Sequence, residues 1–513
     1  MTRLARNICL LLLTALAVPL LFQGQDPVRR TSDHWIRDRF LREGRAGACT
    51  ATLPDGRMLA TGGQGSRGAL GTAEYLSVTG DYLSASPMNV ARSEQVCAAL
   101  PDGRLLVAGG RVTGDAATNA AEIYDPSTDL WTNIPAMGEA RIGATVTPLV
   151  GGTVLIAGGE ASGLASATLE IFDPNTETFS FAGSVMSSPR KNHAATRLPD
   201  GRVLIAGGTD GRTALATVDV FDPASGSIHS LGRMSTPRDG LSATLLDNGQ
   251  VLLAGGSDGA QDLASSDLFD TRSGSMAAGP AMSSPRRGHQ AFLMPHNNTV
   301  MIVGGTSAGE PLASTEQFVW WAGSYRGQFK TVDSLSSARS KMTGAASDTG
   351  MLTIAGGRTA DGALSLVSNT VPVATVTSDK LDYQPGDVVY LSGAGFGPND
   401  VVHVVIHETP TTHADVALDI TADATGAFNH VDVYHVEEHD LGITFHLIAT
   451  GSPSGVTAET SFTDNRNLVL TFAGTGTGTV KITPSVGLVT APIGCGGTGA
   501  FAISQTVTST CLP

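Results

Sequence analysis

The chain has 513 residues, including 62 glycines, and only 5% of its residues are aromatic and 15% charged. This length excludes a single domain with one ordinary hydrophobic core, unless the domain is built from repeats. The many glycines and few charges favour an all-β chain of short strands. The formal net charge of −15 argues against nucleic acid as a partner, because binding it requires a basic surface that releases counterions.

The N-terminal segment predicts export. Arg3 and Arg6 precede an apolar run from Ile8 to Phe22, as in a signal peptide. The small-residue pattern of a cleavage site is weak after this run, so residues 1–25 are expected to be a signal peptide or an uncleaved N-terminal anchor. No later stretch is apolar enough to span a bilayer, so membrane contact would come only from this segment. We therefore expect a secreted, extracellular or cell-envelope protein.

A repeated phrase fills residues 33–370. A glycine pair recurs in seven copies, at spacings of 47 to 52 residues, and an arginine stands 17 or 18 residues before each of these pairs. The pairs begin at Gly62, Gly109, Gly158, Gly207, Gly255, Gly304 and Gly356. The arginines are Arg45, Arg92, Arg141, Arg190, Arg238, Arg286 and Arg339. After six pairs an acid stands close to an aromatic residue, as in Glu122-Ile-Tyr124.

Each copy contains four strand-like runs, which predicts one blade of a β-propeller per copy. The first run follows the arginine, a tight turn such as Pro-Asp-Gly leads to the second, the third carries the acid, and the fourth is short. Trp35 stands where a fourth run is expected, although no other runs precede it, and the last copy ends after its third run. The sequence therefore predicts seven blades over 33–370, with residues 33–38 completing the seventh and closing the circle.

These features together resemble the kelch repeat, in the longer form found in galactose-oxidase-like propellers. That resemblance implies a copper ion held by two histidines and two tyrosines, one tyrosine crosslinked to a cysteine. The sequence departs from this pattern, because Tyr75 and Tyr124 serve as repeat aromatics and no Tyr-His pair stands near Arg339. His193 and His289 each follow a repeat arginine by three residues. A copper-radical oxidase is therefore kept as an alternative only.

The period breaks after the propeller. Alternating strands and turns over residues 373–464 predict a C-terminal β-sandwich, and they resemble the Ig-like modules of bacterial surface proteins. Residues 465–513 look like one small β-repeat of bacterial secreted proteins, which is expected to be truncated at Pro513.

The cysteines suggest one disulfide. Cys495 and Cys511 lie within the small C-terminal unit and are expected to pair in an oxidising compartment. Cys49 and Cys97 stand at offsets that differ by one residue in successive copies. Because side chains alternate along a strand, these two are expected to point to opposite faces and not to bond.

The glycine pairs and the arginines are interpreted as structural. A phosphate loop needs glycines that open a helix, whereas each pair here lies between two strand-like runs, where glycine permits a bulge and close contact between blades. The arginines could form an anion-binding ring. Buried charges must be paired, so each arginine is expected to bind the repeat acid or backbone carbonyls.

Three groups of residues are candidate sites. His435, Glu437 and His439 alternate, so a strand would place them on one face, where they could hold zinc or copper. The simpler interpretation is a strand face that is exposed to solvent. Acids in glycine-rich loops could bind calcium, although Asp-Gly is also ordinary turn chemistry. These loop acids are Asp115, Asp210, Asp258 and Asp361. A loop in the sixth copy carries aromatics that are suited to stacking on a sugar or a protein, or to covering the neighbouring domain or blade. They are Trp320, Trp321 and Tyr325.

No catalytic triad, paired carboxylates or HExxH motif is legible, so no catalytic residue and no cofactor is assigned. The sequence favours a secreted or cell-surface binding protein over an enzyme, with an extracellular glycan or protein as ligand. The alternatives are a copper-radical or carbohydrate-active enzyme and a structural envelope protein.

Overall fold

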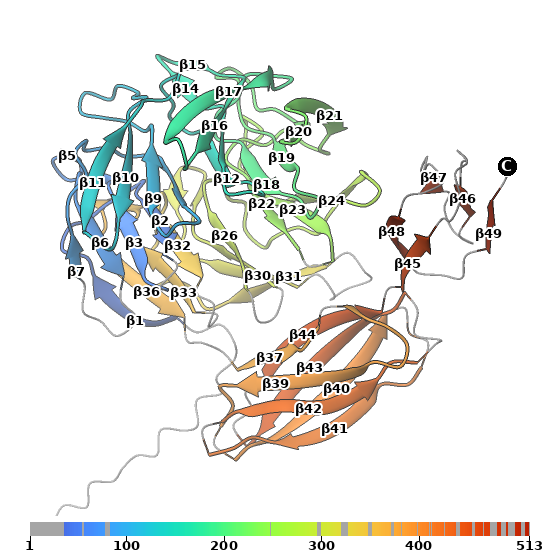
Figure 1. The fold of residues 1–513 in the computed structure, drawn as a ribbon. Coiled ribbons are helices and arrows are strands. Elements are labelled where there is room, and N and C mark those ends of the chain that lie inside the picture. The colour runs from blue at the N-terminus through green and yellow to red at the C-terminus, as the bar shows by residue number, and fades with distance from the viewer. Residues whose placement is uncertain are drawn as a thin grey trace, which may run out of the picture.

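In a computed structural model, every described element is a β-strand (Figure 1). The structure describes residues 35–464 except 54–55, 77–82, 247, 295–298, 320–326, 347–350, 371–373, 381, 398, 410, 412, 425, 438–441 and 454–456. Beyond these it describes the backbone of 466–471, 480–483, 489–490, 498–503 and 508–511. Within this part of the chain no helix is long and apolar enough to cross a membrane.

The repeat region forms seven four-stranded antiparallel sheets, and six of them take their strands from one copy in chain order. The first three are β2(Cys49–Thr52), β3(Met58–Thr61), β6(Ala73–Leu76), β7(Leu83–Ala85); β8(Val96–Ala99), β9(Leu105–Ala108), β10(Ala121–Asp125), β11(Leu130–Ile134); and β12(Thr145–Pro148), β13(Val154–Ala157), β16(Thr168–Asp173), β17(Thr178–Val185). The next three are β18(Ala194–Arg197), β19(Val203–Ala206), β20(Thr217–Asp222), β21(Ser227–Arg233); β22(Ser242–Leu245), β23(Gln250–Ala254), β24(Ser266–Asp270), β25(Met276–Ala278); and β26(Gln290–Leu293), β27(Val300–Val303), β30(Thr315–Val319), β31(Gln328–Val332).

Four short ribbons follow the glycine pairs and connect second to third strands. They are β4(Gln64–Gly65) with β5(Gly68–Ala69), β14(Glu160–Ala161) with β15(Leu164–Ala165), β28(Thr306–Ser307) with β29(Glu310–Pro311), and β34(Arg358–Thr359) with β35(Gly362–Ala363).

The seventh sheet combines both ends of the repeat region. It consists of β32(Thr343–Ala346), β33(Leu352–Ala355), β36(Leu366–Thr370) and β1(Trp35–Phe40), in the order β1-β36-β33-β32. Trp35 lies opposite Thr370, and its indole nitrogen donates to the carbonyl of Asp333 at 3.0 Å. The residue expected to stand in for a missing fourth strand therefore lies in the outermost strand of this sheet.

The sheets pack face to face around their first strands. β2, β8, β12, β18, β22, β26 and β32 each contact the next, and β32 contacts β2 (Figure 1). Second strands such as β9 and β13 are buried along their whole length, since their side chains meet a neighbouring sheet on either side. One cluster joins Leu106 to Val154 and Phe172 of the next sheet. The four-residue apolar runs of the sequence are thus strands covered on both faces.

The glycine pairs are points of close contact between sheets, as predicted. Both glycines of each pair have positive φ, for example 61° and 109° at Gly356 and Gly357. The second glycine donates its N–H to the carbonyl of the arginine in the following sheet, from Gly110 to Arg141 at 2.8 Å and from Gly357 to Arg45 at 2.8 Å. A Cβ on Gly356 would come within 2.3 Å of that Arg45 oxygen. Only glycine fits there, for reasons of conformation and of space.

The expectation for Cys49 and Cys97 is wrong, because the structure joins them in a disulfide with a Cα–Cα distance of 6.1 Å. Cys49 lies in β2 and Cys97 in β8, which belong to neighbouring sheets. Side chains on opposite faces point apart within one sheet but towards each other across the gap between two adjacent sheets. The offset of one residue therefore favours this bond.

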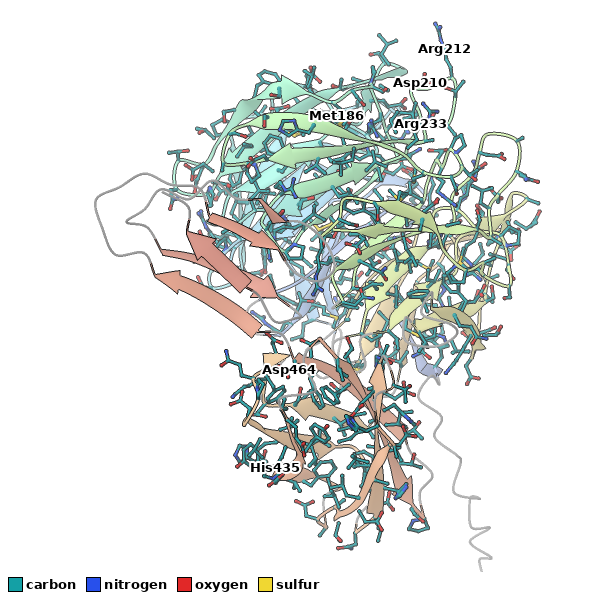
Figure 2. The ribbon with its side chains drawn as sticks, turned by 90° about the vertical axis from the view of Figure 1, so that its right-hand side faces the viewer. Met186, Asp210, Arg212, Arg233, His435 and Asp464 are labelled. Carbon is teal, nitrogen blue, oxygen red and sulfur yellow. A yellow bond between two sulfur atoms is a disulfide. The ribbon has the colours of Figure 1, made fainter. Side chains whose placement is uncertain are left out.

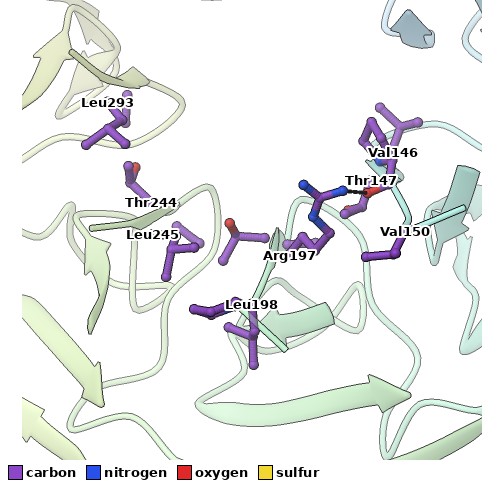
Figure 3. Close-up of a pocket in the computed structure, with 14 residues that line it drawn as sticks. Val146, Thr147, Val150, Arg197, Leu198, Thr244, Leu245 and Leu293 are labelled. Carbon is purple, nitrogen blue, oxygen red and sulfur yellow. Dashed lines mark hydrogen bonds between the residues drawn. The ribbon is translucent and has the colours of Figure 1, made fainter. Parts of the chain in front are cut away.

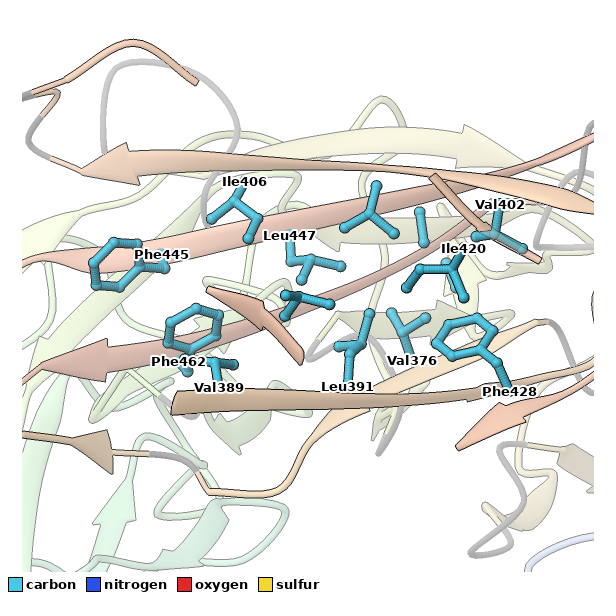
Figure 4. Close-up of a cluster of buried hydrophobic side chains, with 14 of the residues drawn as sticks. Val376, Val389, Leu391, Val402, Ile406, Ile420, Phe428, Phe445, Leu447 and Phe462 are labelled. Atoms are coloured by element: carbon cyan, nitrogen blue, oxygen red, sulfur yellow. The ribbon is translucent and has the colours of Figure 1, made fainter. Parts of the chain in front are cut away.

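Residues 374–464 form two sheets around one apolar core (Figure 4). One contains β37(Thr375–Ser378), β39(Val388–Ala394) and β42(Phe428–His435). The other contains β38(Asp382–Tyr383), β44(Thr457–Asp464), β43(Thr444–Ser452), β40(Val401–Thr409) and β41(Val416–Thr421). The core alternates with exposed positions along each strand, as in β39 and β40.

The C-terminal strands are β45(Arg466–Thr471) paired with β48(Thr498–Ile503), and β46(Val480–Thr483) paired with β47(Val489–Thr490) and β49(Thr508–Cys511). Cys495 lies outside the described residues, so its pairing with Cys511 stays a prediction.

Candidate ligand-binding site

The repeat arginines form a buried layer, which we call the arginine layer. Their side chains are at most 2% exposed. In six copies the guanidinium lies 2.5–2.9 Å from the repeat acid of the same sheet, as in Arg238–Asp267. In the seventh, Ser368 occupies the position of the acid, and Arg339 donates to its hydroxyl at 3.0 Å. As predicted, these arginines are paired within the fold, and they do not form a ring of free charges that could bind an anion.

The repeat acid also holds the turn that precedes the arginine. Glu170 accepts the backbone N–H of Gly138 at 2.6 Å, and Glu316 accepts that of Ser283 at 2.7 Å. Each arginine in turn donates to the carbonyl of the first glycine of its copy, for example Arg238 to Gly255 at 2.9 Å. Arginine, acid and glycine pair are therefore one hydrogen-bonded unit, which fixes where the next residues of the chain must lie.

The residues two positions after each arginine form a second layer, which we call the collar. They are Gly47, Glu94, Gly143, Asn192, Gly240, Gly288 and Lys341. All seven have positive φ, between 48° and 69°. Backbone hydrogen bonds link neighbours, including Glu94 N–H to Gly47 at 2.7 Å and Gly240 N–H to Asn192 at 3.0 Å. Four positions use glycine, which this backbone favours, and three carry polar or charged side chains in spite of it.

The collar surrounds a cavity of about 680 Å³ that is lined by residues from all seven sheets, which we call the polar mouth. Its charges are mostly matched. Lys341 lies 2.5 Å from Glu94, which Arg111 also approaches at 3.3 Å. Burial is the largest influence on Glu94 and would raise its pKa, but Lys341 and Arg111 together hold that pKa below its usual range.

Two further ion pairs lie on the other side of the mouth. Lys191 pairs with Glu160, and Arg287 lies 3.3 Å from Asp262. The sequence analysis missed all of these residues. Several of them could have been found by comparing the copies of the repeat. The positions just after the arginine vary among the copies, whereas the arginine and the glycine pair do not.

Two histidines lie at the base of the polar mouth, three positions after their arginines. The Nε2 atom of His193 lies 2.8 Å from the Thr145 hydroxyl, and that of His289 lies 2.9 Å from the Ser242 hydroxyl. Burial, and to a lesser degree the nearby arginines, lowers the pKa of each to about 3. Both imidazoles are therefore neutral near pH 7 and hydrogen-bond to the first strand of the preceding sheet.

One carboxyl group in the polar mouth is left without a cation. Among the described residues, Asp239 forms no ion pair within 4 Å, and its Oδ1 atom is buried without a hydrogen-bond partner. The Asn192 side chain lies beside the carboxyl group. Burial raises the pKa of Asp239, while Asn192, Arg287 and Lys191 act against that rise.

A different cavity, of about 640 Å³, is lined by β12, β18, β22, β26 and the residues next to them (Figure 3). Val146, Leu198, Leu245 and Leu293 line it, and Arg197 donates to the carbonyl of Pro148 at 3.5 Å. The two cavities differ in charge, because Arg197 is the one charged residue among the described residues that line the second cavity, whereas acids and cations gather in the polar mouth.

The predicted loop acids lie outside the polar mouth. Asp210 accepts the N–H groups of Arg212 and Thr213, both at 2.7 Å, and Asp258 accepts two N–H groups of its own loop at 2.8 Å. Asp210 points outwards at the periphery (Figure 2). Asp115 and Asp361 are exposed. These contacts are ordinary turn chemistry, and calcium binding stays a prediction.

The histidine-rich candidate stays a prediction, because one of its three residues lies outside the described part of the chain. β42 ends at His435, because its partner β39 begins at Val388, so Glu437 lies beyond the strand and does not continue one face. His435 lies 3.0 Å from Asp432 (Figure 2), and His439 is outside the described residues. Within those residues no cluster of three or more His, Cys, Asp or Glu side chains could hold a metal ion. Trp320, Trp321 and Tyr325 also lie outside the described residues.

The copper donor set implied by the resemblance does not fit the described residues. Tyr75 and Tyr124 hydrogen-bond to each other through their hydroxyls at 2.7 Å inside a buried cluster. Cys49 and Cys97 are bonded to each other, so neither is free for a thioether crosslink. The mouth histidines belong to sheets that are not neighbours and already contact hydroxyl groups.

Comparisons with known proteins agree on the fold. The kelch motif matches residues 94–138. A fungal alcohol oxidase of the AA5 family, solved in complex with copper, is similar in structure with a TM-score of 0.57 and 15% identity, over 84% of this chain and 99% of its own. YjhT is similar with a TM-score of 0.46 and 15% identity, over 57% of this chain and 99% of its own. No curated protein matches the sequence. One copy of the repeat thus matches the kelch motif, and the likeness to the oxidase supports a β-propeller fold for the repeat region.

Proposed function

We propose that this chain is an exported glycan-binding protein whose seven-bladed propeller holds a sugar residue in the polar mouth. β1 closes the circle in this proposal, and residues 373–464 act as an Ig-like spacer towards the cell envelope. The pairing of β1 with β36 and the contact of β32 with β2 support closure. The Cys49–Cys97 disulfide supports an oxidising compartment.

The collar carries the proposal. Its backbone is left-handed at every position, so structure alone would favour glycine seven times. Glu94, Asn192 and Lys341 depart from glycine at φ values of 54°, 52° and 48°. Strain of this kind persists where a side chain serves a purpose other than folding. All three side chains line the polar mouth, which points to ligand contact.

The chemistry of the polar mouth suits a sugar. Its lining places carboxylates, amides and cations around one cavity of about 680 Å³, within the usual range for ligand sites. Sugar hydroxyls both donate and accept hydrogen bonds, so they match a lining that offers both. An oxidase is not favoured, since likeness at 15% identity carries the fold alone and the copper donors do not fit.

The test is a glycan array probed with the full-length protein, followed by calorimetry on the best glycan with Glu94→Gly, Asn192→Gly and Lys341→Gly. Each change removes a side chain from a backbone in the left-handed conformation, so the free energy of unfolding should stay the same or rise by about 1 kcal/mol. The affinity for the glycan should fall at least about tenfold. Ala308→Gly is the matched control, because Ala308 also has positive φ at 50° but is exposed outside the mouth. An array without any bound glycan, or full affinity in all three collar variants, would contradict the proposal.

A further inference from the structure

The polar mouth has an unequal charge balance. Four cationic side chains line it: Arg111, Lys191, Arg287 and Lys341. Each of them is within ion-pair distance of a carboxylate in the described part of the chain. The histidines of the mouth are neutral because burial lowers their pKa. Arg111 and Lys341 share the carboxylate of Glu94, whereas Lys191 and Arg287 each have a carboxylate of their own. Every cation of the mouth therefore already lies beside an acid before a ligand arrives.

One carboxyl group of the mouth has no cation beside it. Asp239 is half-buried, lines the mouth and, among the described residues, forms no ion pair within 4 Å. Its buried Oδ1 atom has no hydrogen-bond partner. A buried carboxylate oxygen in this state costs free energy until a donor reaches it, so the fold alone does not account for it.

The repeat supports this reading. The equivalent position, one after the arginine, is Ser93 or Ser340 in two other copies, and these sheets form the same bridge to the residue after the glycine pair. Asp239 itself makes that bridge through its backbone, with Ser257, so its carboxyl group is not needed for it. The side chain is free to serve the mouth.

We propose that Asp239, positioned by Asn192, selects a ligand group that donates hydrogen bonds, and that the polar mouth discriminates against acidic sugars. The donor is a hydroxyl pair of a neutral sugar or the ammonium group of an amino sugar. An acidic sugar would bring its carboxylate to a site whose cations are already paired, beside a carboxylate that repels it. This inference rests on the proposed function and names the class of sugar.

The test compares three forms of one sugar by calorimetry with the full-length protein: galactose, galactosamine and galacturonate, with the matching glucose series. The neutral or the amino form should bind at least about tenfold more tightly than the acid. Which of the two binds better identifies whether hydroxyl or ammonium is the donor. Equal or tighter binding of the acid overturns the inference.

Asp239→Asn and Asp239→Ser complete the test. Both should lower affinity for a neutral sugar about tenfold and for an amino sugar about a hundredfold, because a charged acceptor is lost. Neither should lower the melting temperature, since the serine already occurs in two equivalent positions. Unchanged affinity in both variants would reject the role of Asp239. If the wild-type chain binds none of these sugars and no glycan on the array, the proposed function fails instead.

Discussion

The arginine layer and the collar lie two residues apart along the chain, yet they behave in opposite ways. The arginine is the same in every copy and is buried within a closed set of hydrogen bonds. The collar residue varies among glycine, acid, amide and lysine, although its backbone is the same in every copy. The fold therefore requires the arginine in every copy, whereas the collar side chains can differ because they line the polar mouth.

The contrast has a physical origin. A buried guanidinium is tolerated where an acid and carbonyl groups accept most of its donors, so these partners cannot vary without cost. A collar side chain points into a cavity, where water can replace a lost partner. Variation is therefore cheap at the collar and expensive in the arginine layer.

The largest effect is expected from breaking the arginine layer. Arg238→Met leaves Asp267 buried without its cation and should lower the free energy of unfolding by about 3–5 kcal/mol. The double variant with Asp267→Leu removes both charges and should recover part of that loss. Urea denaturation measures both. A double variant less stable than Arg238→Met would show that the acid is held mainly by other partners, such as the N–H of Ser235.

The second-largest effect is expected at Gly255, whose carbonyl accepts a hydrogen bond from Arg238. A Cβ on Gly255 would lie 2.6 Å from the Arg286 carbonyl and 2.8 Å from a carbon of His289. Gly255→Ala should therefore cost about 2–4 kcal/mol, from crowding and from a left-handed backbone. Gly259→Ala is the control in the same copy, since φ is 97° there but nothing lies within 4 Å of the added atom. It should cost only about 1–2 kcal/mol. Equal losses in thermal melts would remove close packing from the explanation.

Near neutral pH the smallest expected effect is a pH dependence of stability that arises from the two histidines of the polar mouth. His193 and His289 have pKa values of about 3 when folded, against 6.5 unperturbed. The unfolded chain therefore binds protons first, so stability is complete above about pH 6.5 and falls by roughly 1.4 kcal/mol per pH unit and histidine towards pH 3.

Replacing both histidines tests this slope. The change to glutamine follows Gln95, which occupies the equivalent position and donates to the Thr61 carbonyl at 2.8 Å. His193→Gln with His289→Gln should flatten the dependence of stability on pH between 6.5 and 4, measured by urea unfolding at each pH. A slope as steep as in the wild type would assign it to other groups.

Much of the propeller could be predicted from the sequence because repetition averages out local ambiguity. Seven glycine pairs in register indicated strand ends, and the fourth runs led to Trp35, which pairs in β1 with the last copy. The pairing of arginine with the repeat acid followed from burial alone. These features depend on short-range sequence patterns that recur in each copy.

The disulfide and the polar mouth needed the tertiary structure. Whether Cys49 and Cys97 meet depends on the faces of two different sheets, which alternation along one strand does not specify. The mouth gathers residues from seven copies, so no single stretch of sequence contains it.

The sequence by itself determined the repeat, its strands and its arginine-acid unit, since these are local and periodic. Only the tertiary structure decided that Asp239, Asn192, Glu94 and Lys341 line one cavity, because residues spread over some 250 positions meet only when the sheets are packed around a common centre.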